Sequence, residues 1–167
     1  LEASGKPALS RTCEVPEFKH ACLGGVYAMK GAIRHLALDG AGSQAIVVCA
    51  DIAEYARVSS GEPTQGAGAV AMLLEEDPTL AVVDLIGSGS ASDYRVMDFR
   101  KPMSRFCGQD RSQSHQVQDF PVFNGKYSTT CYIDETLQAL NDMYEKRQLD
   151  PAEYLRSLRA VFMHRPY

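Results

Sequence analysis

The sequence lacks several features that would place it in a special class of protein. It contains no apolar run that approaches the roughly 20 residues of a membrane span. Its formal net charge is −4 at pH 7, so it has no positive surplus with which to bind nucleic acid. Residues 1–20 are polar and contain no signal-peptide core. These absences exclude a membrane partner and a nucleic-acid partner, and they predict a cytoplasmic location.

The cysteines form neither a disulfide framework nor a metal motif. They stand at positions 13, 22, 49, 107 and 131, an odd number without a Cys-x-x-Cys pair. Neither paired disulfides nor a zinc site is therefore indicated. We expect most of these residues to be free thiols that pack as small apolar side chains.

The chain is long enough for one folded core. Its 167 residues are 45% hydrophobic and 23% charged, which is ordinary for a globular domain. Apolar residues recur at helical spacing at Val26, Met29, Ile33 and Leu36, which predicts a helix. Gly40 is well placed to end this helix. The same spacing returns in Ile133, Leu137, Leu140 and Tyr144. Asp150-Pro151-Ala152-Glu153 is typical of a capped helix start.

Short apolar runs between these helices predict strands. The runs are residues 45–51, 69–76, 80–86 and the closing stretch from residue 160 to His164. Residues 59–68 are rich in glycine and proline and predict a loop. Residues 87–123 are polar and aperiodic, and such long excursions are usually functional or disordered. The mixture of strands and helices predicts an α/β protein.

Cys22 lies where the first helix is expected to begin, directly before Leu23 and the pair Gly24-Gly25. Unpaired N–H groups and the positive end of the helix dipole favour the thiolate, which is the nucleophilic form of cysteine. The two glycines would let another backbone or a substrate come close. The same position also suits a structural thiol, and the stretch alone leaves both interpretations open.

A nucleophilic cysteine needs an acid or base, and four histidines are candidates. His164 follows an apolar run and could act on a cysteine that the fold brings near, or it could be a half-buried structural histidine. His20 stands two residues before Cys22, where we expect a turn. His35 is expected to be exposed on the helix, and His115 to be solvated in a polar loop.

Three further segments carry polar residues that could bind a substrate, but each is a weak signal on its own. Thr64 lies in a loop that could cradle a substrate but has no Gly-Lys-Ser/Thr phosphate signature. Asp98 and Phe99 pair an acid with an aromatic ring in the long polar excursion. Ser128 or Thr129 could present a hydroxyl to a substrate or could only cap a helix start.

Six motifs occur in a fixed order along the chain: ACLGG, IVVCADIAEYA, GEPTQGAGAVAMLL, YRVMDFRKP, FNGKYSTTCY and FMHRPY. Together they closely resemble the 3-hydroxy-3-methylglutaryl-CoA (HMG-CoA) synthase family, a branch of the thiolase-like condensing enzymes. That family shows ACYGG around its nucleophile and an FH-P[YF] ending. The resemblance runs from about residue 17 to the last residue. It implies a thiolase-like α/β fold, with a mixed sheet packed by helices, that is incomplete in this chain.

The resemblance also implies a division of the chain. Residues 1–167 would be part of one thiolase-like domain. The nucleophile region would span about 17–86, the substrate-pocket excursion about 87–128, and the helices with the histidine strand about 129–167. Cys22 would stand at the N-terminus of a buried helix.

The family's chemistry would follow from the matched residues. Cys22 would accept an acetyl group from acetyl-CoA, the acetyl methyl would attack the ketone of acetoacetyl-CoA, and hydrolysis would release HMG-CoA. His164 matches the catalytic histidine that positions the acetoacetyl substrate and assists the chemistry. The other matched positions would bind substrate: Thr64, Gly66, Asp98, Phe99 and Ser128. The resemblance implies no metal, no cofactor beyond the CoA thioesters, and a homodimer.

Two departures from the family pattern are visible. Leu23 stands where the family usually has tyrosine, so no hydroxyl is present beside the nucleophile. The family's general-base glutamate lies some tens of residues before the cysteine, and its CoA-binding lysines follow the histidine. Glu14, Glu17 and Glu62 do not match that glutamate. We therefore expect an internal piece of an enzyme, inactive on its own as a full synthase.

Three alternatives remain at this point. A synthase that installs β-branches during polyketide assembly would act on acyl carrier proteins, but it tends to carry a D-T-C-R-P-like segment, and DFRKP is nearer the CoA enzyme. An initiation-type ketoacyl synthase fits GEPTQGAGAVA and FNGKYS less well. A non-catalytic thiolase-like subunit would need neither Cys22 nor His164.

Overall fold

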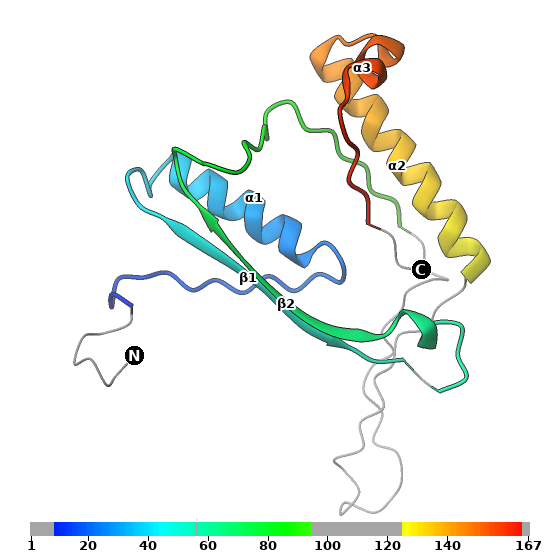
Figure 1. Cartoon of the computed structure of the whole chain (residues 1–167), viewed down its shortest axis with the longest axis horizontal. Coiled ribbons are helices and arrows are strands. Elements are labelled where there is room, and N and C mark those ends of the chain that lie inside the picture. Colours follow the sequence, from blue (N-terminus) through cyan, green and yellow to red (C-terminus); the bar gives the residue numbers. More distant parts are fainter. Residues whose placement is uncertain (1–8, 56, 95–124, 165–167) are drawn as a thin grey trace, which may run out of the picture. The chain divides into compact units, whose positions relative to one another are not determined.

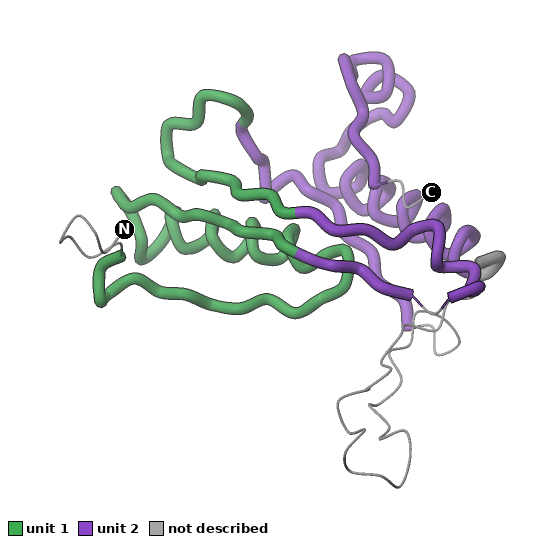
Figure 2. Tube along the Cα trace, turned by 60° about the horizontal axis from the view of Figure 1, so that its bottom comes forward, with its two compact units in different colours: residues 1–50, 69–81 green, residues 51–68, 82–167 purple. Residues whose placement is uncertain are grey.

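The computed structural model describes residues 9–55, 57–94 and 125–164. Its elements, in chain order, are α1 (Gly24–Ala37), β1 (Ala45–Ala53), the short 3₁₀ helix η2 (Glu62–Thr64), β2 (Gly66–Leu74), α2 (Gly125–Arg147) and α3 (Pro151–Ser157) (Figure 1). β1 and β2 pair as a two-stranded antiparallel sheet. The chain divides into two compact units (Figure 2): unit 1 is residues 1–50 with 69–81, and unit 2 is residues 51–68 with 82–167.

α1 confirms the helix predicted from the apolar spacing. Leu36 is only 6% exposed, whereas Val26, near the start of the helix, is 43% exposed. Met29 and Ile33 between them are half-buried. Leu36 is the only buried residue of α1, so within the described residues only one face of α1 packs. The buried helix that the resemblance implies stays a prediction.

The end of α1 depends on Gly40, as expected. The N–H groups of Leu38 and Gly40 both donate to the His35 carbonyl oxygen, at 3.1 and 2.8 Å. A Cβ at position 40 would overlap the His35 ring, so only glycine lets the chain turn this closely. His35, which the sequence predicts to be exposed, is half-buried on α1, with a side chain that is 37% exposed and an Nδ1 that lies 2.9 Å from Asp39 Oδ1.

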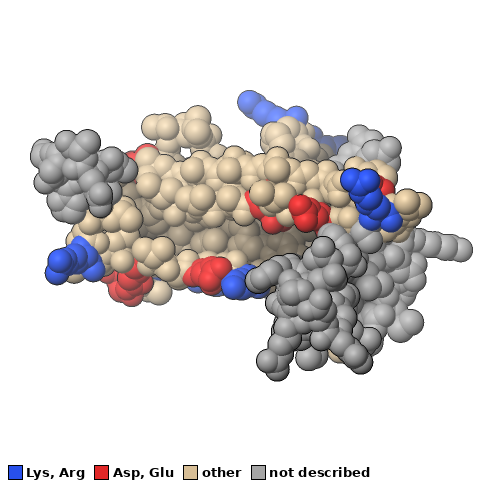
Figure 3. All heavy atoms as spheres, turned by 90° about the horizontal axis from the view of Figure 1, so that it is seen from below, with Lys and Arg blue, Asp and Glu red and all other residues tan. Residues whose placement is uncertain are grey.

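The β1 strand has one covered side in unit 1. Val47 is 5% exposed and the Cys49 sulfur lies against α1, while Ile46 and Val48 are each 66% exposed. This alternation is typical of a strand packed on one face. Figure 3 views the molecule from below, and most atoms in view there are uncharged. The open face of β1 is apolar because it carries Ile46 and Val48.

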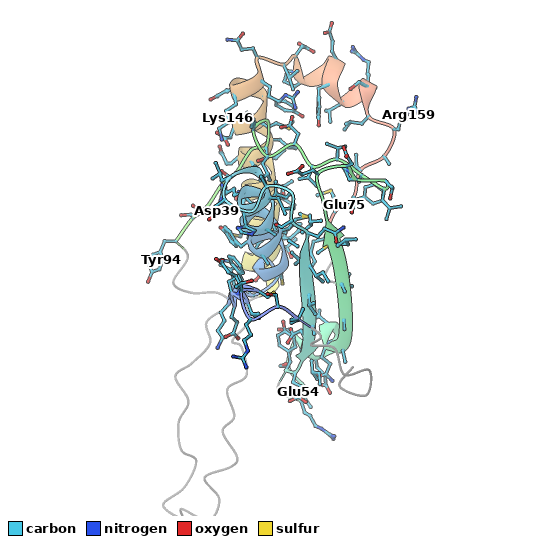
Figure 4. All side chains as sticks on the ribbon, turned by 90° about the vertical axis from the view of Figure 1, so that its left-hand side faces the viewer. Asp39, Glu54, Glu75, Tyr94, Lys146 and Arg159 are labelled. Atoms are coloured by element: carbon cyan, nitrogen blue, oxygen red, sulfur yellow. The ribbon has the colours of Figure 1, made fainter. Side chains whose placement is uncertain are left out.

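In unit 1, polar contacts join the residues that precede β1 to the residues that follow β2. The Gly42 N–H donates to Glu76 Oε1 at 3.0 Å, and Gln44 Nε2 donates to Glu75 Oε2 at 2.9 Å. Figure 4 shows Glu75 at the end of β2. Gly42 has a φ of 76°, a conformation that glycine adopts without strain. The link between α1 and β1 is thereby tied to the chain that leaves β2.

In unit 2, residues 82–92 run along α2 in the opposite direction. Arg147 Nη1 lies 2.8 Å from Asp84 Oδ2, and the Ser90 N–H donates to Asp142 Oδ2 at 2.8 Å. Gly89 lies so close to the α2 backbone that a Cβ would overlap it. Residue 84 contacts residue 147 of α2, and residue 90 contacts residue 142, which lies earlier in the helix. The segment and the helix therefore run antiparallel.

The strand predicted for residues 80–86 is wrong. Leu80, Val82 and Ile86 are 99%, 83% and 96% exposed and belong to no strand. The segment bends instead, because the Gly87 N–H donates to Asp84 Oδ1 at 2.9 Å, an aspartate turn that competes with extended pairing. In the part of the chain that is described, the sheet contains β1 and β2 alone, and this apolar run pairs with neither of them.

The strand predicted from residue 160 to His164 is also wrong. These residues carry no strand pairing, and Val161 and Phe162 are 65% and 94% exposed. A single extended segment leaves its backbone groups unpaired, so apolar content alone does not make a strand. The last three residues of the closing motif lie outside the described part of the chain.

The two C-terminal helices confirm the elements predicted there. α2 begins at Gly125, earlier than the boundary near residue 129 that the sequence indicates. Asp150 caps α3 by accepting the Glu153 N–H at 2.8 Å, as the capping motif requires. The rings of Tyr144 and Tyr154 meet edge to face, with centroids 5.7 Å apart, and join the two helices. None of the described helices is long and apolar enough to cross a membrane.

Candidate functional site

Cys22 lies in the turn that leads into α1. The Gly24 N–H donates to the Ala21 carbonyl oxygen at 3.2 Å, and the Tyr27 N–H donates to the Leu23 carbonyl oxygen at 2.9 Å, which starts the helix. The thiol is exposed. Among the described residues no side chain caps this helix end, and its first turn contains no acidic residue. The predicted position is confirmed: an accessible thiol at an uncapped helix N-terminus, where backbone donors accept negative charge.

At Gly25, three residues after Cys22, a larger residue would not fit. A Cβ at this position would lie only 2.6 Å from Cys49 Sγ, closer than real Cβ contacts come. At Gly25 the close neighbour is thus a second thiol, on β1, whereas at Gly24 it is a backbone atom, the Phe18 carbonyl oxygen, 3.5 Å from where a Cβ would lie. Cys49 is half-buried and carries no disulfide. It sets the distance between β1 and the helix turn that follows Cys22.

His20, the nearer candidate partner of Cys22, has its own contact. Its ring lies against Tyr27, with centroids 5.1 Å apart and planes tilted by 51°. The turn expected there is present at residues 21–23. His20 therefore packs beside the first turn of α1.

The loop between β1 and β2 holds Thr64 and Gly66. Thr64 Oγ1 donates to the Gly61 carbonyl oxygen at 2.8 Å, which leaves its oxygen able to accept a hydrogen bond. Gly66 begins β2, and no described atom would lie within 4 Å of a Cβ there. The loop thus offers an accepting hydroxyl and an open stretch of backbone within a few residues.

The same loop is strained at its tip. Val58 has a φ of 63°, which is costly for a β-branched residue. Its N–H donates to Glu62 Oε2 at 2.6 Å, and this carboxylate holds the turn. Ser59 Oγ is buried and has no hydrogen-bond partner within the described residues. The loop conformation is therefore imposed by local contacts rather than relaxed.

His164 is held by α2. The Tyr132 hydroxyl donates to the His164 carbonyl oxygen at 2.5 Å, and the two ring centroids lie 6.0 Å apart with planes tilted by 40°. Ser128 stands four residues before Tyr132 in the same helix, so the two side chains share one face of α2. The structure therefore places His164 at the helix face that carries Ser128.

Two carboxylates in unit 2 fasten its loops. The Gly87 N–H is the main cause that lowers the pKa of Asp84, and the Arg147 guanidinium lowers it further. Lys146, visible in Figure 4, donates to Asp142 at 2.6 Å, and this bond is the main cause that lowers the pKa of Asp142. These groups hold residues 84–90 against α2.

A cavity of about 440 Å³ opens in unit 2 beside α2. Its lining includes four carboxylates: Asp93, Glu135, Asp142 and Glu145. Such a surface repels phosphate groups, so it is unsuited to the phosphates of CoA. Among the residues that the structure describes, no group of three His, Cys, Asp or Glu side chains could hold a metal ion.

The remaining predicted residues are distributed as follows. Asp98, Phe99 and His115 lie outside the described part of the chain. Cys22 belongs to unit 1 and His164 to unit 2, so their cooperation stays a prediction. No signal in the sequence marks Cys49 as the neighbour of Gly25. Nor does any single out Tyr132, which stands beside the hydroxyl residues that drew attention.

Comparison with known proteins identifies relatives for most of the chain. A family described as "Hydroxymethylglutaryl-coenzyme A synthase N terminal" matches residues 11–79. The hydroxymethylglutaryl-CoA synthase of Enterococcus faecalis is 32% identical over 151 residues, which is 90% of this chain and 34% of that protein. The chain thus spans about a third of the length of this relative.

Solved structures agree with this. MvaS in complex with 3-hydroxy-3-methylglutaryl coenzyme A matches 92% of this chain and 33% of its own, with a TM-score of 0.71 and 35% identity. The HMG synthase of the curacin biosynthetic pathway, in complex with acetyl donor-ACP, matches 90% of this chain and 32% of its own, with a TM-score of 0.67 and 27% identity. The expected thiolase-like α/β fold is confirmed in part of its length. The chain belongs to the hydroxymethylglutaryl-CoA synthase family.

Proposed function

We propose that this chain carries the nucleophile of an HMG-CoA synthase-like acyltransferase. Cys22 takes an acetyl group from acetyl-CoA, and the bound acetyl group condenses with acetoacetyl-CoA to give HMG-CoA and free CoA. The observation that carries the proposal is the exposed Cys22 thiol at the uncapped N-terminus of α1. The kinship with MvaS, which binds 3-hydroxy-3-methylglutaryl coenzyme A, supports the choice of substrate.

The chemistry uses thioester exchange. The Cys22 thiolate attacks the acetyl carbonyl carbon, the bond from that carbon to the CoA sulfur breaks, and CoA leaves as a thiol after it takes a proton. The acetyl methyl then loses a proton, and its carbon forms a bond to the ketone carbon of acetoacetyl-CoA while the C=O π electron pair moves to the ketone oxygen, which takes a proton and becomes the hydroxyl group. Water finally cleaves the thioester to Cys22. Covalent holding makes the condensation nearly unimolecular.

Other residues are assigned to substrate. His164 positions the acetoacetyl group, and the substrate contacts are made by Thr64, Gly66, Asp98, Phe99 and Ser128. Thr64 suits this role because its oxygen can still accept a hydrogen bond. The chain spans only about a third of the length of its relatives, so we expect it to load acetyl without completing the cycle. The homodimer and the cytoplasmic location form part of the same proposal.

A carrier-protein substrate is the second candidate. The curacin pathway synthase, solved with acetyl donor-ACP, has nearly the same TM-score as MvaS, at 0.67 against 0.71. In both candidates the acetyl group passes to the same cysteine. They differ in whether the donor presents its thioester on CoA or on a carrier protein.

Intact-mass measurement tests the proposal. The folded chain is incubated with acetyl-CoA or with acetyl-ACP, beside Cys22→Ala and the matched cysteine control Cys131→Ala. We expect one added acetyl group in the parent chain and in Cys131→Ala, and none in Cys22→Ala. Loading from acetyl-ACP alone would select the second candidate. A folded chain that takes acetyl from neither donor would refute the nucleophile and favour a non-catalytic subunit.

A further inference from the structure

Residues 158–164 return along α2 from the corner where α2 meets α3. Tyr144 and Tyr154 pack at that corner, and the Tyr132 contact lies at the other end of the return. The twelve helical steps from Tyr132 to Tyr144 span about 18 Å. Six steps lead from Leu158 to His164, with a bend at Arg159, and fully extended they would span at most about 20 Å. The segment is therefore long enough to return along α2 to Tyr132, as Figure 1 shows.

Within the described residues, few other contacts hold this segment in place. Val161, Phe162 and Met163 are 65%, 94% and 60% exposed, and none of them belongs to a strand. An extended segment that makes no backbone hydrogen bonds to a neighbouring strand is not fixed in register. A slip by one residue would move His164 by about 3.3 Å and turn its side chain to the other side. A specific contact is therefore needed at the His164 end.

Tyr132 makes two contacts with His164 that have different effects. Its hydroxyl donates to the His164 backbone carbonyl oxygen at 2.5 Å, which fixes the register of the segment. Its ring lies 6.0 Å from the imidazole at a tilt of 40°, within the range in which aromatic rings prefer each other. The ring contact limits the orientations of the imidazole.

The helix supports Tyr132 in this role. Thr136 Oγ1 donates to the Tyr132 carbonyl oxygen at 2.7 Å, and Tyr132 lies more than one turn inside α2. Its side chain is 39% exposed, so its hydroxyl has water as an alternative partner. That it bonds His164 instead makes this contact the anchor of the closing segment.

We propose that Tyr132 is the positioning residue of His164, with the hydroxyl setting the register of residues 158–164 and the ring setting the imidazole orientation. The role in catalysis rests on the function proposed above for His164. The contact itself does not, because it requires neither CoA nor Cys22.

Nuclear magnetic resonance of the full chain tests the proposal without substrate. Histidine and backbone carbonyl carbons are labelled with ¹³C, and His164 is assigned with His164→Gln. Tyr132→Phe keeps the ring and removes the hydroxyl, whereas Tyr132→Leu removes both. We expect the carbonyl resonance of His164 to shift in both variants. We expect its ring-proton resonances to lose part of their ring-current displacement in Tyr132→Phe, because the register is no longer fixed, and to lose all of it in Tyr132→Leu.

Controls separate this result from general unfolding. Tyr154→Phe removes a hydroxyl elsewhere in unit 2 and should leave the His164 signals in place. The His35 signals, which belong to unit 1, should stay unchanged in every variant, and the circular dichroism of α2 should be retained. His164 signals that do not move in Tyr132→Leu would overturn the proposal. Failure of Cys22 to load acetyl would overturn the proposed function but leave these shifts as expected.

Discussion

Gly25→Ala is the sharpest test of how Cys22 is held. Glycine is a poor helix former, so alanine in the first turn of α1 would by itself stabilise the helix by up to about 1 kcal/mol. The new Cβ, however, would lie 2.6 Å from Cys49 Sγ. Crowding of this kind costs about 1–3 kcal/mol because side chains and backbone must move apart. The clash outweighs the gain in helix stability, so we expect a net loss of about 1–2 kcal/mol.

A second substitution isolates the clash. In Gly25→Ala/Cys49→Ala the sulfur is gone, and the nearest remaining atom of residue 49, its Cβ, would lie 3.9 Å from the new methyl group. That is an ordinary contact, so the helix gain should reappear. The double-mutant cycle should therefore give a coupling free energy of about 1–3 kcal/mol. Gly68→Ala is the matched control, since no described atom would lie within 4 Å of its Cβ.

The assay is equilibrium unfolding in urea, followed by circular dichroism, with thermal melts beside it. For a chain of this length, the expected loss corresponds to a fall in Tm of about 2–8 °C. Acetyl loading of Cys22 should slow in Gly25→Ala and recover in the double variant, because the turn that carries the thiol moves with the helix. A coupling below about 0.5 kcal/mol would refute the close approach of Gly25 and Cys49.

The remaining predictions concern stability in other parts of the chain. Val58→Gly should raise the free energy of unfolding by about 1 kcal/mol in urea titrations, since φ is 63° there; a decrease would contradict the strain. Asp150→Ala should lower it by about 1 kcal/mol, because the Glu153 N–H loses its acceptor, whereas Asp150→Asn should retain most of it. Asp84 has a pKa lowered from 3.8, chiefly by the Gly87 N–H, so its contribution is present above that pH and is lost as the pH falls through the folded-state value. Thermal melts should accordingly show Asp84→Asn below the parent at pH 7 and level with it in strong acid, and an equal gap at both pH values would contradict this.

The helices could be predicted from the sequence because their signals are local. The spacing of Met29, Ile33 and Leu36 marks a face within four turns, and Asp150 with Glu153 marks a cap within one. Strands cannot be predicted from local signals in the same way, because a strand forms only when it pairs with a neighbouring strand, and the local sequence does not indicate which segment that is. The apolar run at 80–86 has strand composition, yet it bends where Asp84 accepts the Gly87 N–H.

The candidate site divides in the same way. The position of Cys22 before a helix follows from the residues around it, and the structure has it there. The contact between Gly25 and Cys49 joins a helix to a strand, and that between Tyr132 and His164 joins a helix to a distant extended segment. Neither leaves a periodic or spacing signal, so only the folded chain reveals them.

Both site residues are therefore positioned by elements other than their own. The contact that supports the Cys22 turn comes from β1 in unit 1, and the contact that supports His164 comes from α2 in unit 2. The two sets of contacts share no residue, so their effects on the free energy of unfolding should add. We expect Gly25→Ala/Tyr132→Phe to lose the sum of the two single losses, to within about 0.5 kcal/mol in urea titrations. A larger deviation would mean that the two supports are coupled through residues common to both, and the positioning of Cys22 and of His164 would then have to be treated as one event.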